Sequence, residues 1–226
     1  MKKFIIVLFL VFFSSVSQGH MAHYKKINKI EMEILRNNEV IGYNNYLFDR
    51  KGDTTIVNNQ FKFEVKLLGT IIFKVEGYGE ETYLKDNLIS FQSKTLQNKK
   101  EKFVNLKLDK NNKKFDIKGS SYSGEASVKN IIGNWWSHKI LQAESQISPI
   151  SGSIKEQIVT FIGKENISIN GKQYETDHFK LTSKDMSLPE DKKLNFDIWL
   201  DKKTSVIVKI TYERMGNWEY RLKNLE

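Results

Sequence analysis

The chain has 226 residues, no cysteine, two prolines, 12% aromatic residues and a formal charge of +9. This length fits one all-β domain or two small α/β domains, and the lack of cysteine excludes thiol catalysis and disulfide bonds. Lysine and asparagine are spread through every segment with Asp and Glu between them, whereas a nucleic-acid-binding protein concentrates its basic residues in a stripe. The composition therefore predicts a solvated surface and no nucleic-acid partner.

The first 19 residues have the plan of a secretory signal peptide. Met1-Lys2-Lys3 gives a positive start, Phe4 to Phe13 is an uninterrupted apolar run, and a small polar stretch ends at Gly19. The apolar run is too short to span a bilayer, and no second such run follows. We expect cleavage after Gly19, with Ser17 as the alternative, and an exported, non-lipidated protein of the periplasm without a transmembrane segment.

Residues 20–26 form a short leader before the first strand and are expected to be a flexible mature N-terminus. Cleavage after Gly19 would place His20 at a new N-terminus close to His23. A terminal amine and an imidazole can chelate copper, but no other histidine stands in a pattern that completes such a site. The sequence therefore predicts no metal site.

Residues 27–226 show the hydrophobic pattern of a single antiparallel β domain. Apolar residues alternate with charged ones, and short turns rich in Asn, Asp and Gly separate the runs. The dipeptide Asn170-Gly171 is the strongest hairpin signal among these turns. Strand-like runs, which amount to about thirteen strands, lie at 30–34, 40–48, 61–67, 71–75, 80–84, 88–96, 103–108, 114–118, 157–163, 167–170, 172–181, 194–200, 206–212 and 218–222.

The stretch Gly133 to Leu141 interrupts this pattern and predicts a short helix. Trp135, Trp136 and Ile140 fit helical spacing, and Asn134 is a suitable N-cap. Buried tryptophans remove about 200 Å² each from water, so the pair needs an apolar surface opposite. About thirteen strands exceed what a flat sheet holds comfortably. The expected fold is one strongly curved antiparallel sheet, a half or incomplete β-barrel, with the central helix on its concave side.

Few residues stand in patterns that carry chemistry. The chain has no glycine-rich phosphate loop, no nucleophile elbow and no paired histidines at metal-ligand spacing. Ser137 and His138 would point about 100° apart on a helix and so would not form a catalytic pair. Only one of Glu80 and Glu81 can face inward on a strand, and a buried Glu81 must be hydrogen-bonded or protonated. The sequence predicts no catalytic residue and no cofactor.

Several short motifs occur in an order that resembles a known family. They are Ile41-Gly42, Glu81-Thr82-Tyr83 with Asn87-Leu88 and Thr95, Trp136, Asn170-Gly171 and Trp218-Glu219-Tyr220-Arg221-Leu222. This order resembles an uncharacterised family of exported bacterial proteins, a domain of unknown function, over the whole mature chain. The family is similar in plan to lipoprotein-carrier-like half barrels. The resemblance implies a fold and a compartment but no reaction, and Tyr83 stands where a tryptophan is expected.

Three functions fit these observations. The first is a non-catalytic binding or carrier module for a lipid or other apolar ligand, with Trp135, Trp136, Tyr83 and Glu81 as candidate ligand-binding residues. The second is a structural or assembly factor of the cell envelope whose core is filled. The third is an enzyme that acts on the cell envelope with Glu81 as acid or base. The sequence identifies neither the ligand, nor the oligomeric state, nor a protein partner.

Overall fold

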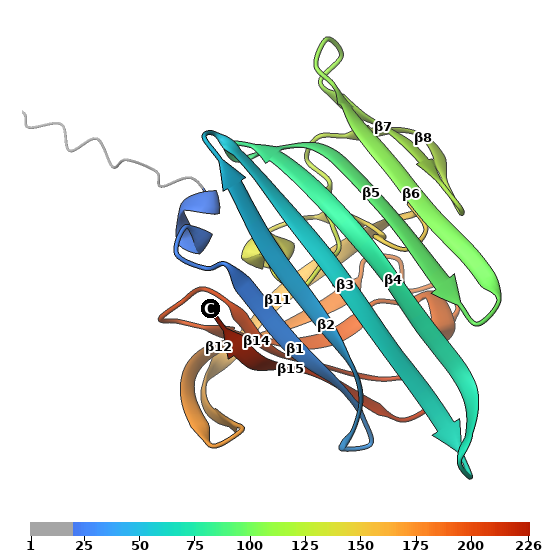
Figure 1. Cartoon of the computed structure of the whole chain (residues 1–226), viewed down its shortest axis with the longest axis vertical. Coiled ribbons are helices and arrows are strands. Elements are labelled where there is room, and N and C mark those ends of the chain that lie inside the picture. Colours follow the sequence, from blue (N-terminus) through green and yellow to red (C-terminus); the bar gives the residue numbers. More distant parts are fainter. Residues whose placement is uncertain (1–19) are drawn as a thin grey trace, which may run out of the picture.

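The structure, a computed structural model, describes residues 20–226, and the expected signal peptide at residues 1–19 lies outside the described residues. Its architecture is mainly β, a single open sheet of 15 strands (Figure 1). The strands are β1 (Lys29–Arg36), β2 (Glu39–Lys51), β3 (Thr54–Leu67), β4 (Thr70–Leu84), β5 (Asn87–Gln97), β6 (Lys100–Asp109), β7 (Lys114–Gly119), β8 (Ser123–Ser127), β9 (Ile131–Ile132), β10 (Ser145–Ile147), β11 (Ile154–Ile169), β12 (Lys172–Ser183), β13 (Asn195–Asp201), β14 (Ile207–Glu213) and β15 (Asn217–Leu225).

The sheet consists of two meanders that join where the first strand pairs with the last. β1 to β8 follow one another on one side, β15 back to β11 follow one another on the other side, and β1 pairs antiparallel with β15. Every pair is antiparallel except β9 with β10. Strands β8 and β9 form the two edges of the sheet. Only residues 128–130 connect these edges along the chain, and no ladder joins them. We call residues 128–130 the seam.

The predicted central helix at 133–141 is wrong. Trp135 and Trp136 lie in a bend, and only His138–Leu141 forms a 3₁₀ turn, η2. Ser137 takes the N-cap position predicted for Asn134 and accepts a hydrogen bond from the Lys139 N–H. Residues 133–141 pass between the two meanders, and we call them the crossing segment. Their helical spacing was misleading because a segment in this position has apolar neighbours on both sides. Its backbone uses partners other than those of an α-helix: the Gly133 N–H donates to the Ile147 carbonyl, and the Trp135 N–H donates to the Tyr46 hydroxyl at 3.2 Å.

The strand count also differs from the expected thirteen. β4 is continuous where two strands were predicted, because its two glycines pack closely rather than form a turn. A Cβ on Gly77 would lie 2.7 Å from the Phe61 ring and 2.6 Å from the Lys94 carbonyl oxygen. β11 is likewise continuous, with a bulge next to Gly163. The short strands β8, β9 and β10 lie in a region where no period of two was visible.

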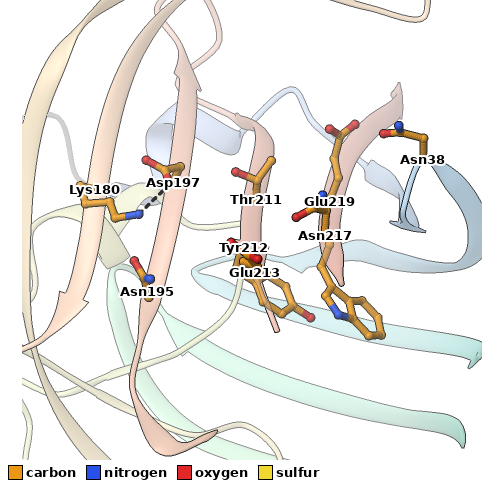
Figure 2. A pocket seen from close by; sticks show the side chains of 10 residues that line it. Asn38, Lys180, Asn195, Asp197, Thr211, Tyr212, Glu213, Asn217 and Glu219 are labelled. Atoms are coloured by element: carbon orange, nitrogen blue, oxygen red, sulfur yellow. Dashed lines mark hydrogen bonds and ion pairs between the residues drawn. The ribbon is translucent and has the colours of Figure 1, made fainter. Parts of the chain in front are cut away.

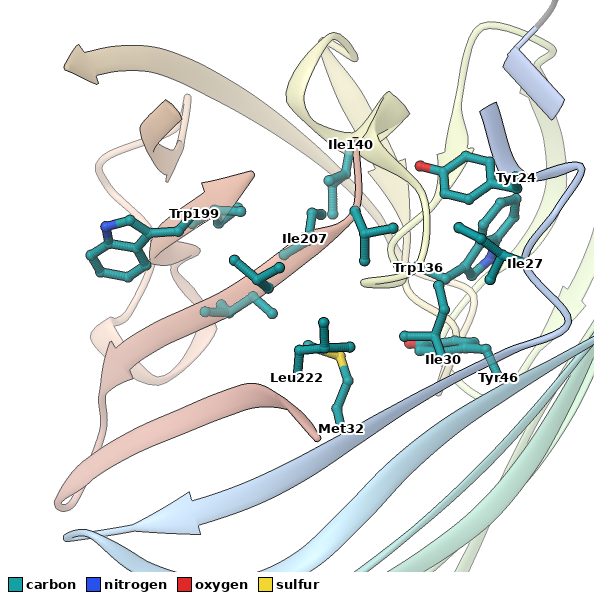
Figure 3. Packing of buried hydrophobic residues seen from close by; sticks show 14 of the residues in the cluster. Tyr24, Ile27, Ile30, Met32, Tyr46, Trp136, Ile140, Trp199, Ile207 and Leu222 are labelled. Atoms are coloured by element: carbon teal, nitrogen blue, oxygen red, sulfur yellow. The ribbon is translucent and has the colours of Figure 1, made fainter. Parts of the chain in front are cut away.

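The main hydrophobic core fills the space between the two meanders (Figure 3). It includes Ile30 and Met32 of β1, Leu181 and Ile198 of the second meander, and Trp136 of the crossing segment. A second cluster lies under β5 to β8 and a third lies around Trp218. Within residues 20–226, no helix combines the length and hydrophobicity needed to cross a membrane. The crossing segment therefore supplies the core that ties the two meanders together.

Candidate functional site

Three of the four predicted ligand-binding residues meet at one buried point. Glu81 and Tyr83 come from the inner face of β4, and Trp136 comes from the crossing segment. The Glu81 carboxylate accepts hydrogen bonds from the Tyr83 hydroxyl at 2.5 Å, the Asn134 side-chain amide at 2.6 Å and the Trp136 indole N–H at 2.9 Å. Trp135 does not join them, because its ring packs edge-to-face against Phe196 at 5.1 Å between centroids.

Burial dominates the electrostatics of this cluster. It raises the pKa of Glu81 from 4.5 to about 7, although the hydrogen bonds from Tyr83, Trp136 and Asn134 act in the opposite direction. Burial also raises the pKa of Tyr83 well above its usual value, and the Glu81 charge adds to that rise. Glu81 is 3% exposed and does not line a cavity. Its partners and its burial make it a structural carboxylate of the core.

Asn134 belongs both to this cluster and to the lining of a cavity. Its side chain is buried, and its amide nitrogen donates to Glu81. That bond fixes which end of the amide is which, because a carboxylate oxygen needs a donor. The Asn134 Oδ1 atom is left buried and without a hydrogen-bond partner. A buried acceptor without a partner costs stability, and this one belongs to a residue that lines a cavity.

That cavity lies at the seam between the two sheet edges and has a volume of about 380 Å³. The seam residues Val128 and Asn130 line it, together with the turns β4–β5 and β6–β7 and the first part of the crossing segment. Its lining residues are Tyr83, Asp86, Asn87, Leu88, Leu108, Lys110, Lys113, Phe115, Val128, Asn130, Ile131, Ile132, Asn134, Ser137 and Lys139. Apolar walls, three lysines and the Asn134 side chain thus line one hollow.

The lysines differ in how they are held. Lys139 is half-buried and its ammonium donates to the Asp86 backbone carbonyl at 3.3 Å, and burial lowers its pKa. Lys110 and Lys113 are exposed on the β6–β7 turn and form no ion pair with residues 20–226. Sequence reasoning missed all three, because nothing distinguishes them from the other scattered lysines. It also read Asn134 as a helix cap, and only the fold reveals its free acceptor.

The leader expected to be flexible instead forms a 3₁₀ turn, η1 (His20–Tyr24), that docks on the crossing segment. Tyr24 is completely buried and its hydroxyl lies 2.8 Å from His138 Nδ1. His20 Nε2 lies 2.8 Å from the Ser137 hydroxyl, and His20 Nδ1 lies 3.3 Å from His138 Nε2. Ser137 therefore contacts a histidine, but that histidine is His20 rather than its neighbour His138.

Burial keeps the imidazole of His20 neutral. It lowers the pKa of His20 to about 2, with smaller contributions from Lys139, His138 and His23. Burial also lowers the pKa of His138. A base with so low a pKa is a poor proton acceptor near neutral pH. Within residues 20–226, no group of His, Asp and Glu side chains is arranged to hold a metal ion. We interpret the pair as a hydrogen-bonded clamp for the leader.

Acidification is expected to release this clamp. His20 is neutral when docked, whereas its pKa is 6.5 in solvent, so docking is fully stable above pH 6.5 and weakens as the pH falls below 6.5. The amide of Ile27, which donates to the Tyr24 carbonyl, should exchange faster at pH 5 than at pH 7 after correction for intrinsic rates. His20→Gln keeps a polar side chain without this titration and should reduce the difference. Equal protection of wild type at both pH values would contradict the expectation.

A second hollow, of about 360 Å³, lies on the polar face of the second meander (Figure 2). Lys180 and Asp197 form an ion pair there at 2.7 Å, and Thr211 and Glu219 stand on the next strands. Asp197 also contacts His178, which stacks on Trp199 at 4.3 Å between ring centroids. The side chains of this hollow are mostly polar and partly bonded to one another. It offers no apolar wall comparable to that of the seam cavity.

One solved structure agrees with this architecture. No curated protein matches the chain. Among solved structures, it is similar to a β-barrel-like protein of domain of unknown function DUF1849 from Brucella abortus, with 11% identity, a TM-score of 0.58, and coverage of 88% of this chain and 95% of that chain. A DUF1329 family protein from Desulfovibrio piger matches with 12% identity over 91% of this chain and 88% of that chain, with a TM-score of 0.20. At such identities the Brucella protein supports the fold alone.

The family itself follows from a direct match over most of the described sequence. Residues 32–223 match the domain of unknown function DUF6134. This span runs from β1 to β15 and includes the crossing segment, Glu81 and the seam cavity. The expected resemblance to an uncharacterised family of barrel-like plan is confirmed. The chain belongs to the DUF6134 family.

Proposed function

We propose that the protein is an exported, non-catalytic binding protein that holds an amphipathic, anionic ligand in the seam cavity. The observation that carries this proposal is the seam cavity of about 380 Å³, whose walls are mostly apolar and whose lining includes three lysines and the buried polar residue Asn134. Binding sites of this kind combine apolar lining with a few convergent polar groups. Export by the sequence at residues 1–19 is part of the proposal, and it places the protein in the periplasm.

The lining indicates the chemistry of the ligand. Leu88, Leu108 and Phe115 would contact an apolar tail, and the lysines of the β6–β7 turn would meet a carboxylate or phosphate. A volume of about 380 Å³ is at the small end of ligand sites. It suits a single acyl chain or part of one rather than a complete diacyl lipid.

A specific observation also favours the second candidate, a structural or assembly factor with a filled core. Trp136 is completely buried and packs against residues of both meanders, which supports a role in filling the concave side. In this case the cavity would be incidental, and the outer surface would carry the function. Ligand occupancy of the seam cavity separates the two candidates.

Filling the cavity is expected to abolish ligand uptake. Val128→Trp places a large ring on an exposed lining residue, so it should weaken binding of a fluorescent C18 fatty acid at least tenfold without lowering stability. Val40→Trp is the matched control, since Val40 is similarly exposed on β2 and does not line the cavity. Native mass spectrometry of the wild type, purified without detergent, should show an apolar adduct that Val128→Trp lacks.

The lysines provide an independent test of the anionic group. Lys110→Ala combined with Lys113→Ala should weaken binding of a fatty acid but leave binding of the corresponding fatty alcohol unchanged, because only the acid carries a charge. Lys202→Ala with Lys203→Ala, in an exposed turn outside the cavity, should change neither. An adduct-free mass together with no probe binding would rule out the binding function and leave the structural candidate.

A further inference from the structure

The tip of the β3–β4 hairpin exposes a continuous set of aliphatic side chains. Leu67, Leu68, Ile71 and Ile72 are 61%, 99%, 49% and 53% exposed; we call residues 67–72 the apolar tip. Ile71 and Ile72 are consecutive on a strand, so they point to opposite faces, yet both are exposed. The tip therefore projects beyond the core, whose last buried residue on β3 is Val65. Figure 1 shows this hairpin extending past its neighbours.

Leu68 occupies a backbone position that suits it poorly. Its φ is +48° and that of Gly69 is +80°, which is the pattern of a two-residue hairpin turn that favours Asn-Gly. At the corresponding position the β5–β6 and β11–β12 hairpins use Asn98 and Asn170, and the β4–β5 hairpin uses Lys85, so these other turns carry a polar residue there. Leucine has a Cβ penalty in this conformation and no polar group to offset it. Nothing else in residues 20–226 covers the Leu68 side chain. Burial in an external apolar phase would remove the cost of its exposure and offset the cost of its positive φ.

Positive charge surrounds the apolar tip. Lys66 adjoins it on β3, and the β5–β6 turn lies alongside, because Asn98 exchanges two hydrogen bonds of 2.8 Å with the backbone of Lys74. That turn carries Lys99 and Lys100. Lys74 is paired with Glu76 at 3.0 Å, whereas Lys66, Lys99 and Lys100 form no ion pair with residues 20–226. Aliphatic side chains framed by free lysines match the acyl region and phosphates of an anionic membrane surface.

We propose that the apolar tip inserts into the surface of a bilayer that contains anionic phospholipid, with Lys66, Lys99 and Lys100 against the phosphates. Leu68 enters the acyl region, where the cost of its exposure disappears. The seam cavity lies at the opposite end of β4, about 40 Å away along the strand, so docking leaves it accessible. This inference does not depend on a ligand in the cavity.

The test uses the chain from His20 onward, which contains every strand of the sheet, and vesicles that contain phosphatidylglycerol and phosphatidylethanolamine. Wild type should float with these vesicles, and much less with vesicles of phosphatidylcholine alone. Leu68→Asn should reduce vesicle binding about tenfold or more, because the variant loses the free energy of burying a leucine side chain in the acyl region. The same change should raise Tm by about 2–4 °C, because asparagine tolerates the turn conformation better.

Opposite effects on stability and membrane binding distinguish docking from a structural role. Met186→Asn is the control, because Met186 is also highly exposed but lies in a distant loop, and it should bind vesicles like wild type. Leu68→Asn should also keep its affinity for the fatty acid probe. Wild type that does not float, Leu68→Asn that floats normally, or a dimer that Leu68→Asn dissociates would each overturn the proposal.

Discussion

Replacing Trp136 with alanine is expected to lower the free energy of unfolding by about 3–5 kcal/mol, the cost of deleting a large aromatic side chain from a core. The indole packs edge-to-face on Tyr24 at 5.0 Å, Phe48 at 5.3 Å and Tyr83 at 5.8 Å between centroids. The substitution would also remove one donor from the buried Glu81. Denaturant unfolding of wild type and variant at pH 7 measures the difference.

Trp135→Ala is the matched comparison for this prediction. Trp135 precedes Trp136, but it is only half-buried and contacts Phe196 and Tyr220 at the margin of the core. Trp135→Ala should therefore lower the free energy of unfolding clearly less than Trp136→Ala does. A small effect of Trp136→Ala together with altered uptake of the fatty acid probe would instead mean that Trp136 moves to admit the ligand, and the filled-core interpretation would be wrong.

Replacing Glu81 with leucine is expected to cost about 3 kcal/mol or more, because three buried donors lose their acceptor and each such loss costs about 1–3 kcal/mol. The donors belong to Tyr83, Asn134 and Trp136. Glu81→Gln should be much milder, since the amide oxygen can still accept from Asn134 and Trp136. The two variants have similar volume but different hydrogen-bonding capacity, so their difference measures the value of the acceptor.

Glu81 should also make stability depend on pH in a characteristic direction. Its pKa is about 7 in the folded protein and 4.5 in solvent, so folding favours the protonated form. The stability from this group is complete below pH 4.5, falls as the pH rises to about 7 and stays low above that. The difference between the two pKa values corresponds to about 3 kcal/mol in the free energy of unfolding. Relative to Glu81→Gln, wild type should therefore lose stability between pH 4.5 and pH 8; a constant difference would contradict a raised pKa.

The strands were predictable because their pattern is local. Alternation identifies which residues of β4 face inward, and it is the reason that Glu81 and Tyr83 share the inner face while Glu80 does not. The breaks within β4 and β11 were misread, because a glycine that allows close packing looks the same in sequence as a glycine that makes a turn. Gly77 is of the first kind, since the Phe61 ring occupies the space of its missing side chain.

The site was less predictable because its parts come from separate segments. Trp136 could be recognised as a buried anchor, and Glu81 as a carboxylate that needs partners. The conformation around Trp136 could not be predicted, because contacts from both meanders determine it and override the helical spacing. The seam cavity depends on the failure of β8 and β9 to pair, and no local pattern encodes that failure. The docking of His20 on Ser137 joins residues 117 positions apart.

The pairing of β1 with β15 has a consequence for how the chain folds. Ile30 lies opposite Leu225, so the ladder that joins the two meanders closes a loop of nearly the whole described chain. Contacts of such long range are slow to form, because the entropy of loop closure is lost before the contacts stabilise the fold. Until β15 is available, β1 and β14 each present an unpaired edge. The chain should therefore remain unfolded or partly folded until its last strand has been synthesised, a state that is compatible with the export proposed above.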